Sequence, residues 1–185
     1  MSIGLPGDPT PEQMAARMIR VDHAGEYGAT RIYAGQLAIL GRGGKGDLIR
    51  QMQAQEQLHL RTFNDMIADR RVRPTAMLPF WHLAGFALGA MTAALGERAA
   101  MACTVAVEEA IDDHYTAQLG TLDELEDLGS EQSALRQTVE KFRADELEHR
   151  DIGLQQGAEQ APGYRLLSRV IKAGCRAAIV ISERV

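Results

Sequence analysis

Residues 135–153 read LRQTVEKFRADELEHRDIG, and this stretch decides the fold. Read as a helix, it turns one stripe of side chains toward a core at alternating steps of four and three: Leu135, Val139, Phe142, Glu146, His149 and Gly153. Two ionisable side chains therefore stand where apolar ones are expected. A carboxylate that faces a core is costly unless it is paired, hydrogen-bonded or bound to a metal. The stripe thus predicts a helix that carries a buried polar site.

A second stretch shows the same anomaly earlier in the chain. Its stripe, again at steps of four and three, is Met52, Glu56, His59, Phe63 and Met66. In both stretches the Glu precedes the His by three residues, so both side chains leave one face of one helix. A single Glu-x-x-His motif is weak, because a lone core histidine is as readily structural as it is a ligand. Two such motifs on apolar stripes favour a shared site.

Length and composition are those of one globular domain. The 185 residues are 45% hydrophobic and 24% charged, so we expect a single domain over 1–185 with a flexible arm at 1–11. Aromatic residues make up only 5%, which favours helices over sheets. The net charge of −5 argues against a general nucleic-acid binder. Cys103 and Cys175 have no ligand spacing, and we interpret them as reduced, small hydrophobic residues rather than as a disulfide.

Breaker residues divide the chain into segments. We expect helices at 11–40, 47–71, 97–122, 130–161 and 163–185, with an acidic turn at 123–127. The loop after the first helix carries glycines in the spacing G-x-G-x-x-G: Gly41, Gly43 and Gly46. A dinucleotide-binding loop follows a strand, whereas this one follows a helix, so we interpret it as a turn.

The segment 74–96 contains no Asp, Glu, Lys or Arg and satisfies the length rule for a membrane span. Pro79 and His82 weaken that interpretation. The motif Gly85-x-x-x-Gly89 permits close helix packing either in lipid or in a soluble core. We favour a helix that is partly exposed to lipid or to a partner over a true span.

The final helix places a basic stripe opposite an apolar one. The basic residues recur at helical spacing: Arg165, Arg169, Lys172 and Arg176. Such a helix suits an anionic membrane surface, and a solvated face on a packed helix explains it almost as well.

The two halves of the chain share a faint repeat. In each half a Glu is followed at identical offsets by a Tyr and a Gln: Glu26, Tyr33 and Gln36, then Glu108, Tyr115 and Gln118. Each half then continues into a Glu-x-x-His helix, and even the approach to it matches, with Ala54-Gln55-Glu56 against Ala144-Asp145-Glu146. Each half is therefore predicted to be a helical hairpin that offers one Glu from its first helix and a Glu and a His from its second.

Two such hairpins make a four-helix bundle with four carboxylates and two imidazoles at its centre, the ligand set of ferritin-like di-iron or di-manganese proteins. The predicted fold is therefore all-α: a ferritin-like four-helix bundle with two additional helices, the apolar 74–96 segment and the C-terminal amphipathic helix. The predicted metal ligands are Glu26, Glu56, His59, Glu108, Glu146 and His149.

Charge explains why this set suits metal ions. Four ionised carboxylates and two divalent ions carry equal and opposite charge, so the buried site is neutral when loaded. Without metal, the carboxyl pKa values must rise or the bundle must loosen. Oxygen-rich ligation with two imidazoles suits iron or manganese better than zinc or copper. The outer ring nitrogens of the histidines need acceptors, for which Asp145 and Asp22 are candidates.

Several blocks of the chain resemble the demethoxyubiquinone hydroxylase family of ubiquinone biosynthesis. They are MIRVDHAGEYGATRIYAGQLAIL (18–40), MACTVAVEEAIDDHY (101–115), FRADELEHRDIGL (142–154) and AGCRAAIVISERV (173–185). The resemblance runs from about residue 14 to the C-terminus. It implies that the family's iron ligands fall on the six residues named above, with no departure from the family pattern.

The resemblance also implies an activity. It is that of a monooxygenase in which two iron ions, cycling between Fe2+ and Fe3+, use O2 to hydroxylate the ring of a polyprenylated demethoxyubiquinol, with NADH as a candidate electron donor. His114 and Tyr115, beside Glu108, are candidates to orient the ring or relay a proton, and a solvated His and a core Tyr explain them equally well. The rival interpretations are a ferritin-like iron-storage protein and a lipid-presenting subunit whose Glu and His residues only brace the bundle.

The expected partners are the polyprenyl quinol, a membrane surface, a second copy of the chain and other ubiquinone-biosynthesis proteins, but no nucleic acid. The first residues, MSIGLPGDPTPEQ, match neither a signal peptide nor a mitochondrial presequence. We therefore expect a bacterial-type peripheral protein on the cytoplasmic face of the cell membrane, or a chain that has already been processed.

Overall fold

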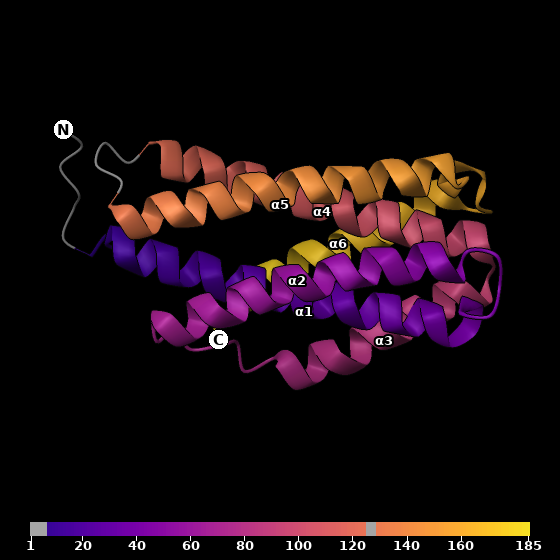
Figure 1. Cartoon of the computed structure of the whole chain (residues 1–185), viewed down its shortest axis with the longest axis horizontal. Coiled ribbons are helices and arrows are strands. Elements are labelled where there is room, and N and C mark those ends of the chain that lie inside the picture. The colour runs from indigo at the N-terminus through magenta and orange to yellow at the C-terminus, as the bar shows by residue number, and fades with distance from the viewer. Residues whose placement is uncertain (1–6, 125–128) are drawn as a thin grey trace.

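The computed structural model describes residues 7–124 and 129–185, and within these ranges every regular element is a helix. Part of the expected arm and most of the expected acidic turn lie outside the described residues. The elements follow one another along the chain (Figure 1): α1 (Pro11–Leu40), α2 (Gly46–Asp69), α3 (Leu78–Ala94), α4 (Glu97–Asp123), α5 (Ser130–Gln155), the 3-10 turn η1 (Ala158–Gln160) and α6 (Tyr164–Ser182). The all-α prediction is confirmed.

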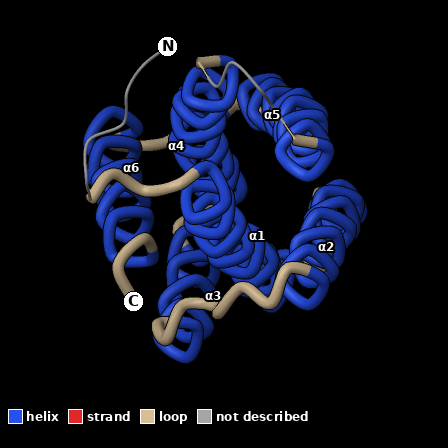
Figure 2. Tube along the Cα trace, turned by 90° about the vertical axis from the view of Figure 1, so that its left-hand side faces the viewer, coloured by secondary structure: helices blue, strands red, loops and turns tan. Residues whose placement is uncertain are grey.

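Four helices form the bundle that the repeat predicts. Helix α1 packs against α2, α4 packs against α5, and α1 also contacts both helices of the second pair. Helices α3 and α6 lie outside this bundle, against α1 and α4 (Figure 2). The arrangement is compatible with a ferritin-like bundle that carries two additional helices.

Local signals set the helix ends. The Thr10 hydroxyl accepts a hydrogen bond from the Gln13 amide, while the Gln13 side chain accepts one from the Thr10 amide, and Pro11 fills the first helical position. The expected end of the fifth helix at 161 is wrong. Helix α5 stops at Gln155 because Gly157 takes a left-handed conformation, with φ 88°, that terminates the helix.

The apolar 74–96 segment becomes the 17-residue helix α3, which is shorter than the segment because residues 76 and 77 form a turn before it and residue 95 forms a turn after it. None of the described helices combines the length and hydropathy that crossing a membrane requires. Glycines bring α3 very close to α1. A Cβ atom added at Gly89 would lie 1.9 Å from the Ile32 carbonyl oxygen, and one at Gly35 would lie 2.1 Å from the Phe86 carbonyl oxygen. The small residues therefore serve packing within the chain.

The basic stripe of α6 is divided between α4 and the surface. Lys172 forms an ion pair with Glu109, and Arg176 forms one with Asp113 at 3.1 Å. Arg165 is exposed, as is Arg169. Lys172 and Arg176 therefore bind the helix to α4, whereas the other two basic residues of the stripe face outward.

Within the bundle the apolar core forms two clusters with a polar layer between them, and a third cluster lies where α3 and α6 pack against α1 and α4. One bundle cluster contains Ile49 and Met101, and the other contains Phe63 and Leu135. Each of the four bundle helices contributes one or two of the predicted ligands, and these lie along the helix between residues of the two bundle clusters. All six residues of the 135–153 stripe are buried, as predicted. Cys103 is free, and so is Cys175, in agreement with the sequence interpretation.

Candidate metal centre

The six predicted ligand side chains meet in this polar layer, and each is at most 1% exposed. Their ligand atoms form two groups of four, each with all its atoms within 4.8 Å of one another. Glu26 and His59 belong to one group, Glu108 and His149 belong to the other, and two glutamates belong to both: Glu56 and Glu146. The bundle therefore offers two adjacent positions for a cation, joined by two shared carboxylates.

Both histidines turn the same ring nitrogen toward the centre. The Nδ1 atom of His59 lies 3.1 Å from Glu146 Oε1 and 3.5 Å from Glu26 Oε2. The Nδ1 atom of His149 lies 2.9 Å from Glu56 Oε1 and 3.4 Å from Glu146 Oε2. The two halves of the site thus present the same donor atoms in the same sense.

Two buried tyrosines connect the halves crosswise. The Tyr33 hydroxyl donates to Glu108 Oε1 at 2.9 Å, and the Tyr115 hydroxyl donates to Glu26 Oε1. Each tyrosine therefore fixes the glutamate of the other half. Tyr115 is buried, as expected of a core residue, and its hydroxyl also contacts a predicted ligand. The contact of Tyr33 was missed, although its place in the repeat was a signal that could have led to it.

The outer ring nitrogens of the histidines bind acceptors from the facing helix. Asp145 Oδ2 lies 3.1 Å from His59 Nε2, and Gln55 Oε1 lies 3.2 Å from His149 Nε2. The expectation that Asp145 serves such a role is confirmed. Its partner is His59 of the facing helix and not His149 of its own helix, because each imidazole reaches across the interface between α2 and α5. The expectation for Asp22 is wrong, since it bonds the side chains of His114 and Gln118.

The shared glutamate Glu146 differs from the other three carboxyl groups. Burial raises the pKa of Glu26, and it raises the pKa values of Glu56 and Glu108 well above the ordinary value. Burial acts in the same direction on Glu146, but hydrogen bonds from His149 and His59 outweigh it and lower its pKa to about 2. The expected rise of the carboxyl pKa values therefore holds except where a carboxylate lies between two imidazoles.

The carboxylates around the two histidines favour the protonated form of each imidazole. Burial lowers their pKa values, but the neighbouring carboxylates outweigh it and raise the pKa of both His59 and His149 to about 11. A cation that binds Nδ1 must displace such a proton.

The donor set fits a pair of cations. Several buried oxygen atoms have no hydrogen-bond donor among the described residues, including Glu26 Oε2, Glu56 Oε2 and Glu108 Oε2. Buried polar atoms are normally satisfied, so acceptors that converge without donors indicate positive charge between them. Carboxylate oxygens with two imidazoles favour iron or manganese.

Comparison with known proteins shows the family to which the chain belongs. The model of the family described as "Ubiquinone biosynthesis protein COQ7" matches residues 13–182. The chain belongs to this family. The family membership expected from the sequence is thereby confirmed.

Curated relatives of the COQ7 family match nearly the whole chain. The 3-demethoxyubiquinol 3-hydroxylase of Rhodospirillum rubrum is 56% identical over 98% of this chain and 83% of its own length. The NADPH-dependent 3-demethoxyubiquinone 3-hydroxylase, mitochondrial, of Homo sapiens is 53% identical over 99% of this chain and 83% of its own length. The 5-demethoxyubiquinone hydroxylase, mitochondrial, of Saccharomyces cerevisiae is 40% identical over 91% of this chain and 77% of its own length. The name of the human relative contains NADPH, whereas the expected donor here was NADH.

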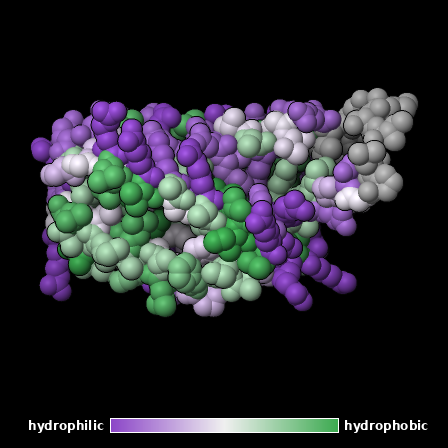
Figure 3. Space-filling model, turned by 180° about the vertical axis from the view of Figure 1, so that it is seen from behind, coloured by the Kyte–Doolittle hydropathy of each residue, from purple (hydrophilic) through white to green (hydrophobic). Residues whose placement is uncertain are grey.

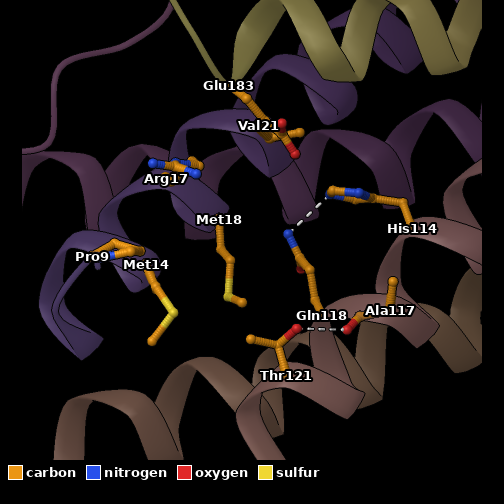
Figure 4. Close-up of a pocket in the computed structure, with 10 residues that line it drawn as sticks. All are labelled: Pro9, Met14, Arg17, Met18, Val21, His114, Ala117, Gln118, Thr121 and Glu183. Atoms are coloured by element: carbon orange, nitrogen blue, oxygen red, sulfur yellow. Dashed lines mark hydrogen bonds between the residues drawn. The ribbon is translucent and has the colours of Figure 1, made fainter. Parts of the chain in front are cut away.

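Two of the cavities that the described residues form differ in whether they reach the metal centre. One, of about 260 Å³, is lined by Met14, Met18 and Gln118, with Gln118 hydrogen-bonded to His114 at its wall (Figure 4). It touches none of the six ligands. The other, of about 700 Å³, includes His59 in its wall and is lined by α2 and α5. The 700 Å³ cavity therefore reaches the metal centre. His114 lies in the wall of the 260 Å³ cavity, which does not contain any of the six ligands.

Proposed function

We propose that this chain is a 3-demethoxyubiquinol 3-hydroxylase that uses two iron ions and O2 to hydroxylate the ring of a polyprenylated quinol. The observation that carries the proposal is the pair of four-atom ligand groups that share Glu56 and Glu146 in the middle of the bundle. The family and the names of its relatives point to the same substrate class. A nicotinamide nucleotide is proposed as the source of electrons, as the relatives' names suggest.

Each residue of the centre has a defined task in this proposal. Iron supplies the redox chemistry that activates O2. Glu56 and Glu146, which belong to both ligand groups, would hold both ions, and Tyr33 and Tyr115 keep the outer glutamates in position through their hydroxyl groups. The two apolar clusters exclude bulk water from either end of the polar layer, which strengthens the electrostatic interactions inside it.

The proposed substrate carries a hydrophobic prenyl tail, and the surface of the protein has an apolar face that could contact the membrane holding it. We define the apolar face as the exposed hydrophobic residues of α3, the residue that follows it, and α6, which gather on one side of the molecule (Figure 3): Phe80, Leu83, Phe86, Met91, Leu95, Leu166, Val170, Val180 and Ile181. A contiguous apolar face of this kind is typical of a protein or membrane interaction site. We propose that it rests on the cytoplasmic face of a cell membrane that holds the prenyl tail.

The reaction is tested directly with labelled oxygen. Reduced, iron-loaded protein mixed with demethoxyubiquinol and isotopically labelled O2 is expected to yield a hydroxylated quinol that carries one labelled oxygen atom, as measured by mass spectrometry. Label found only in water, or uptake of many iron ions per chain without any hydroxylated product, would favour the storage interpretation instead.

The membrane proposal is tested with point variants of the apolar face. Leu166 is 69% exposed and Val170 is 61% exposed, so neither is needed for the core. Burial of such a side chain contributes about 1.5–3 kcal/mol, so replacing both with glutamate should weaken binding to vesicles of anionic lipid by at least about tenfold. Sedimentation with vesicles measures this binding. Leu58→Glu on α2, where Leu58 is 55% exposed, is the matched control and should bind like the unaltered protein. An equal loss of vesicle binding in both variants would contradict the assignment of this face to the membrane.

A further inference from the structure

The two halves of the metal centre repeat the same contacts, with one chemical difference. Tyr33 and Tyr115 occupy corresponding positions and make corresponding hydrogen bonds. Gln55 and Asp145 also correspond, because each precedes the shared glutamate of its own helix by one residue. Each accepts from, or faces, the outer nitrogen of the histidine on the opposite helix, at 3.2 Å and 3.1 Å. Behind one imidazole stands a neutral amide, and behind the other stands a carboxylate.

The difference acts on one metal position. When Nδ1 of His59 binds a cation, its Nε2 carries the proton and donates to Asp145. A carboxylate in this place makes the imidazole a more basic ligand and adds a negative charge near the cation, whereas an amide does neither to that extent. Removal of such an outer partner typically lowers metal affinity by about 10–100-fold. The position that contains His59 therefore has an advantage that the position of His149 lacks.

The surroundings of Asp145 leave this advantage largely intact. Its side chain is only 23% exposed, so solvent screens its charge incompletely. Asp145 lies in the wall of the 700 Å³ cavity, together with the cations Lys141 and Arg61 and the acid Asp65. In the structure, Asp145 is the acid of this wall that bonds a predicted ligand, since its oxygen lies against His59.

We infer that the two metal positions are unequal, and that the ion bound by Glu26 and His59 binds first because Asp145 supports His59. The inference rests on the proposed two-metal site. Asp145 is a positioning residue, which acts on the metal through the imidazole. Gln55 is its neutral counterpart on the other side.

The test is a titration of the metal-free protein with Co2+. Calorimetry and the visible absorption of the bound ion measure the binding. The unaltered protein should bind two ions in two steps that differ in affinity by about tenfold or more. In Asp145→Asn, which keeps the size of the side chain, the tighter step should weaken by about 10–100-fold while the weaker step stays in place. In Gln55→Glu, the weaker step should strengthen. Asp145→Glu should restore the difference between the steps.

Asp65→Asn is the matched control, because Asp65 lies in the same cavity wall without touching a ligand. It should leave both steps unchanged. Unchanged steps in both Asp145→Asn and Gln55→Glu would overturn the inference, as would an equal loss in Asp65→Asn. Absence of any Co2+ binding by the unaltered protein would instead overturn the proposed two-metal site. If Asp145→Asn does not fold by circular dichroism, Gln55→Glu decides alone, since a strengthened weaker step supports the inference and an unchanged one rejects it.

Discussion

Replacement of Glu146 by alanine is expected to abolish hydroxylation. Glu146 belongs to both ligand groups and is fully buried, so one substitution removes a ligand from each metal position at once. It also removes the carboxylate that both imidazoles face, at 3.1 Å from His59 and 3.4 Å from His149. We expect the affinity for divalent metal to fall by more than the roughly 100-fold that marks the upper end for loss of an outer partner. Product formation and metal content per chain are the measurements.

The matched control for this variant is Glu148→Ala. Glu148 lies on the same helix and is exposed, so its loss should change neither activity nor metal content. The Glu146 variant should keep a helical circular dichroism spectrum, because the two apolar clusters on either side of the polar layer remain. A Glu146→Ala protein that hydroxylates the quinol at the normal rate would refute the ligand assignment.

The second large effect is on stability, and it should differ between two glycines of α1, Gly35 and Gly25. Gly35→Ala is expected to lower the free energy of unfolding by at least about 1–3 kcal/mol, which is the usual cost of overpacking. The new Cβ would meet the Phe86 carbonyl oxygen at 2.1 Å and the Ala90 amide nitrogen at 2.7 Å. Both are backbone atoms, so α3 must move away from α1. For a chain of this length the melting temperature should fall by about 2–4 °C for each kcal/mol.

Gly25→Ala should have the opposite sign. A Cβ at Gly25 would meet nothing within 4 Å, and the position is exposed on the same helix. Alanine in place of glycine in a helix interior stabilises it by about 0.5–1 kcal/mol, because the unfolded chain loses conformational freedom. Thermal unfolding followed by circular dichroism compares the two variants. Similar melting temperatures for both would mean that α1 and α3 do not pack as closely as the structure shows.

Periodicity could predict most of the fold because each helix obeys it locally. The stripe from Leu135 to Gly153 is buried throughout its length, and Glu146 and His149 stand out only because apolar residues surround them at helical spacing. The repeat then supplied Glu26 and Glu108, which carry no motif of their own. Helix ends were less predictable, since the end of α5 depends on the left-handed conformation of Gly157 rather than on any change in hydropathy.

The pairing of polar groups around the centre lay beyond the sequence. Asp145 is near His149 along α5, yet it bonds His59 on α2, because an imidazole that directs Nδ1 inward directs Nε2 toward the facing helix. The role of α3 had the same ambiguity, because Gly85-x-x-x-Gly89 suits a partner in lipid as well as a partner in a core. Only the position of α1 shows that the partner belongs to the same chain.

The sequence by itself determined the helices, the two hairpins and the six polar residues that face inward, because these depend on spacing along a single helix. The tertiary structure alone decided which tyrosine holds which glutamate, which acceptor stands behind which histidine, and why the pKa of Glu146 falls while those of the other three carboxyl groups rise. These features depend on distances between side chains of different helices, and such distances arise only when the helices pack.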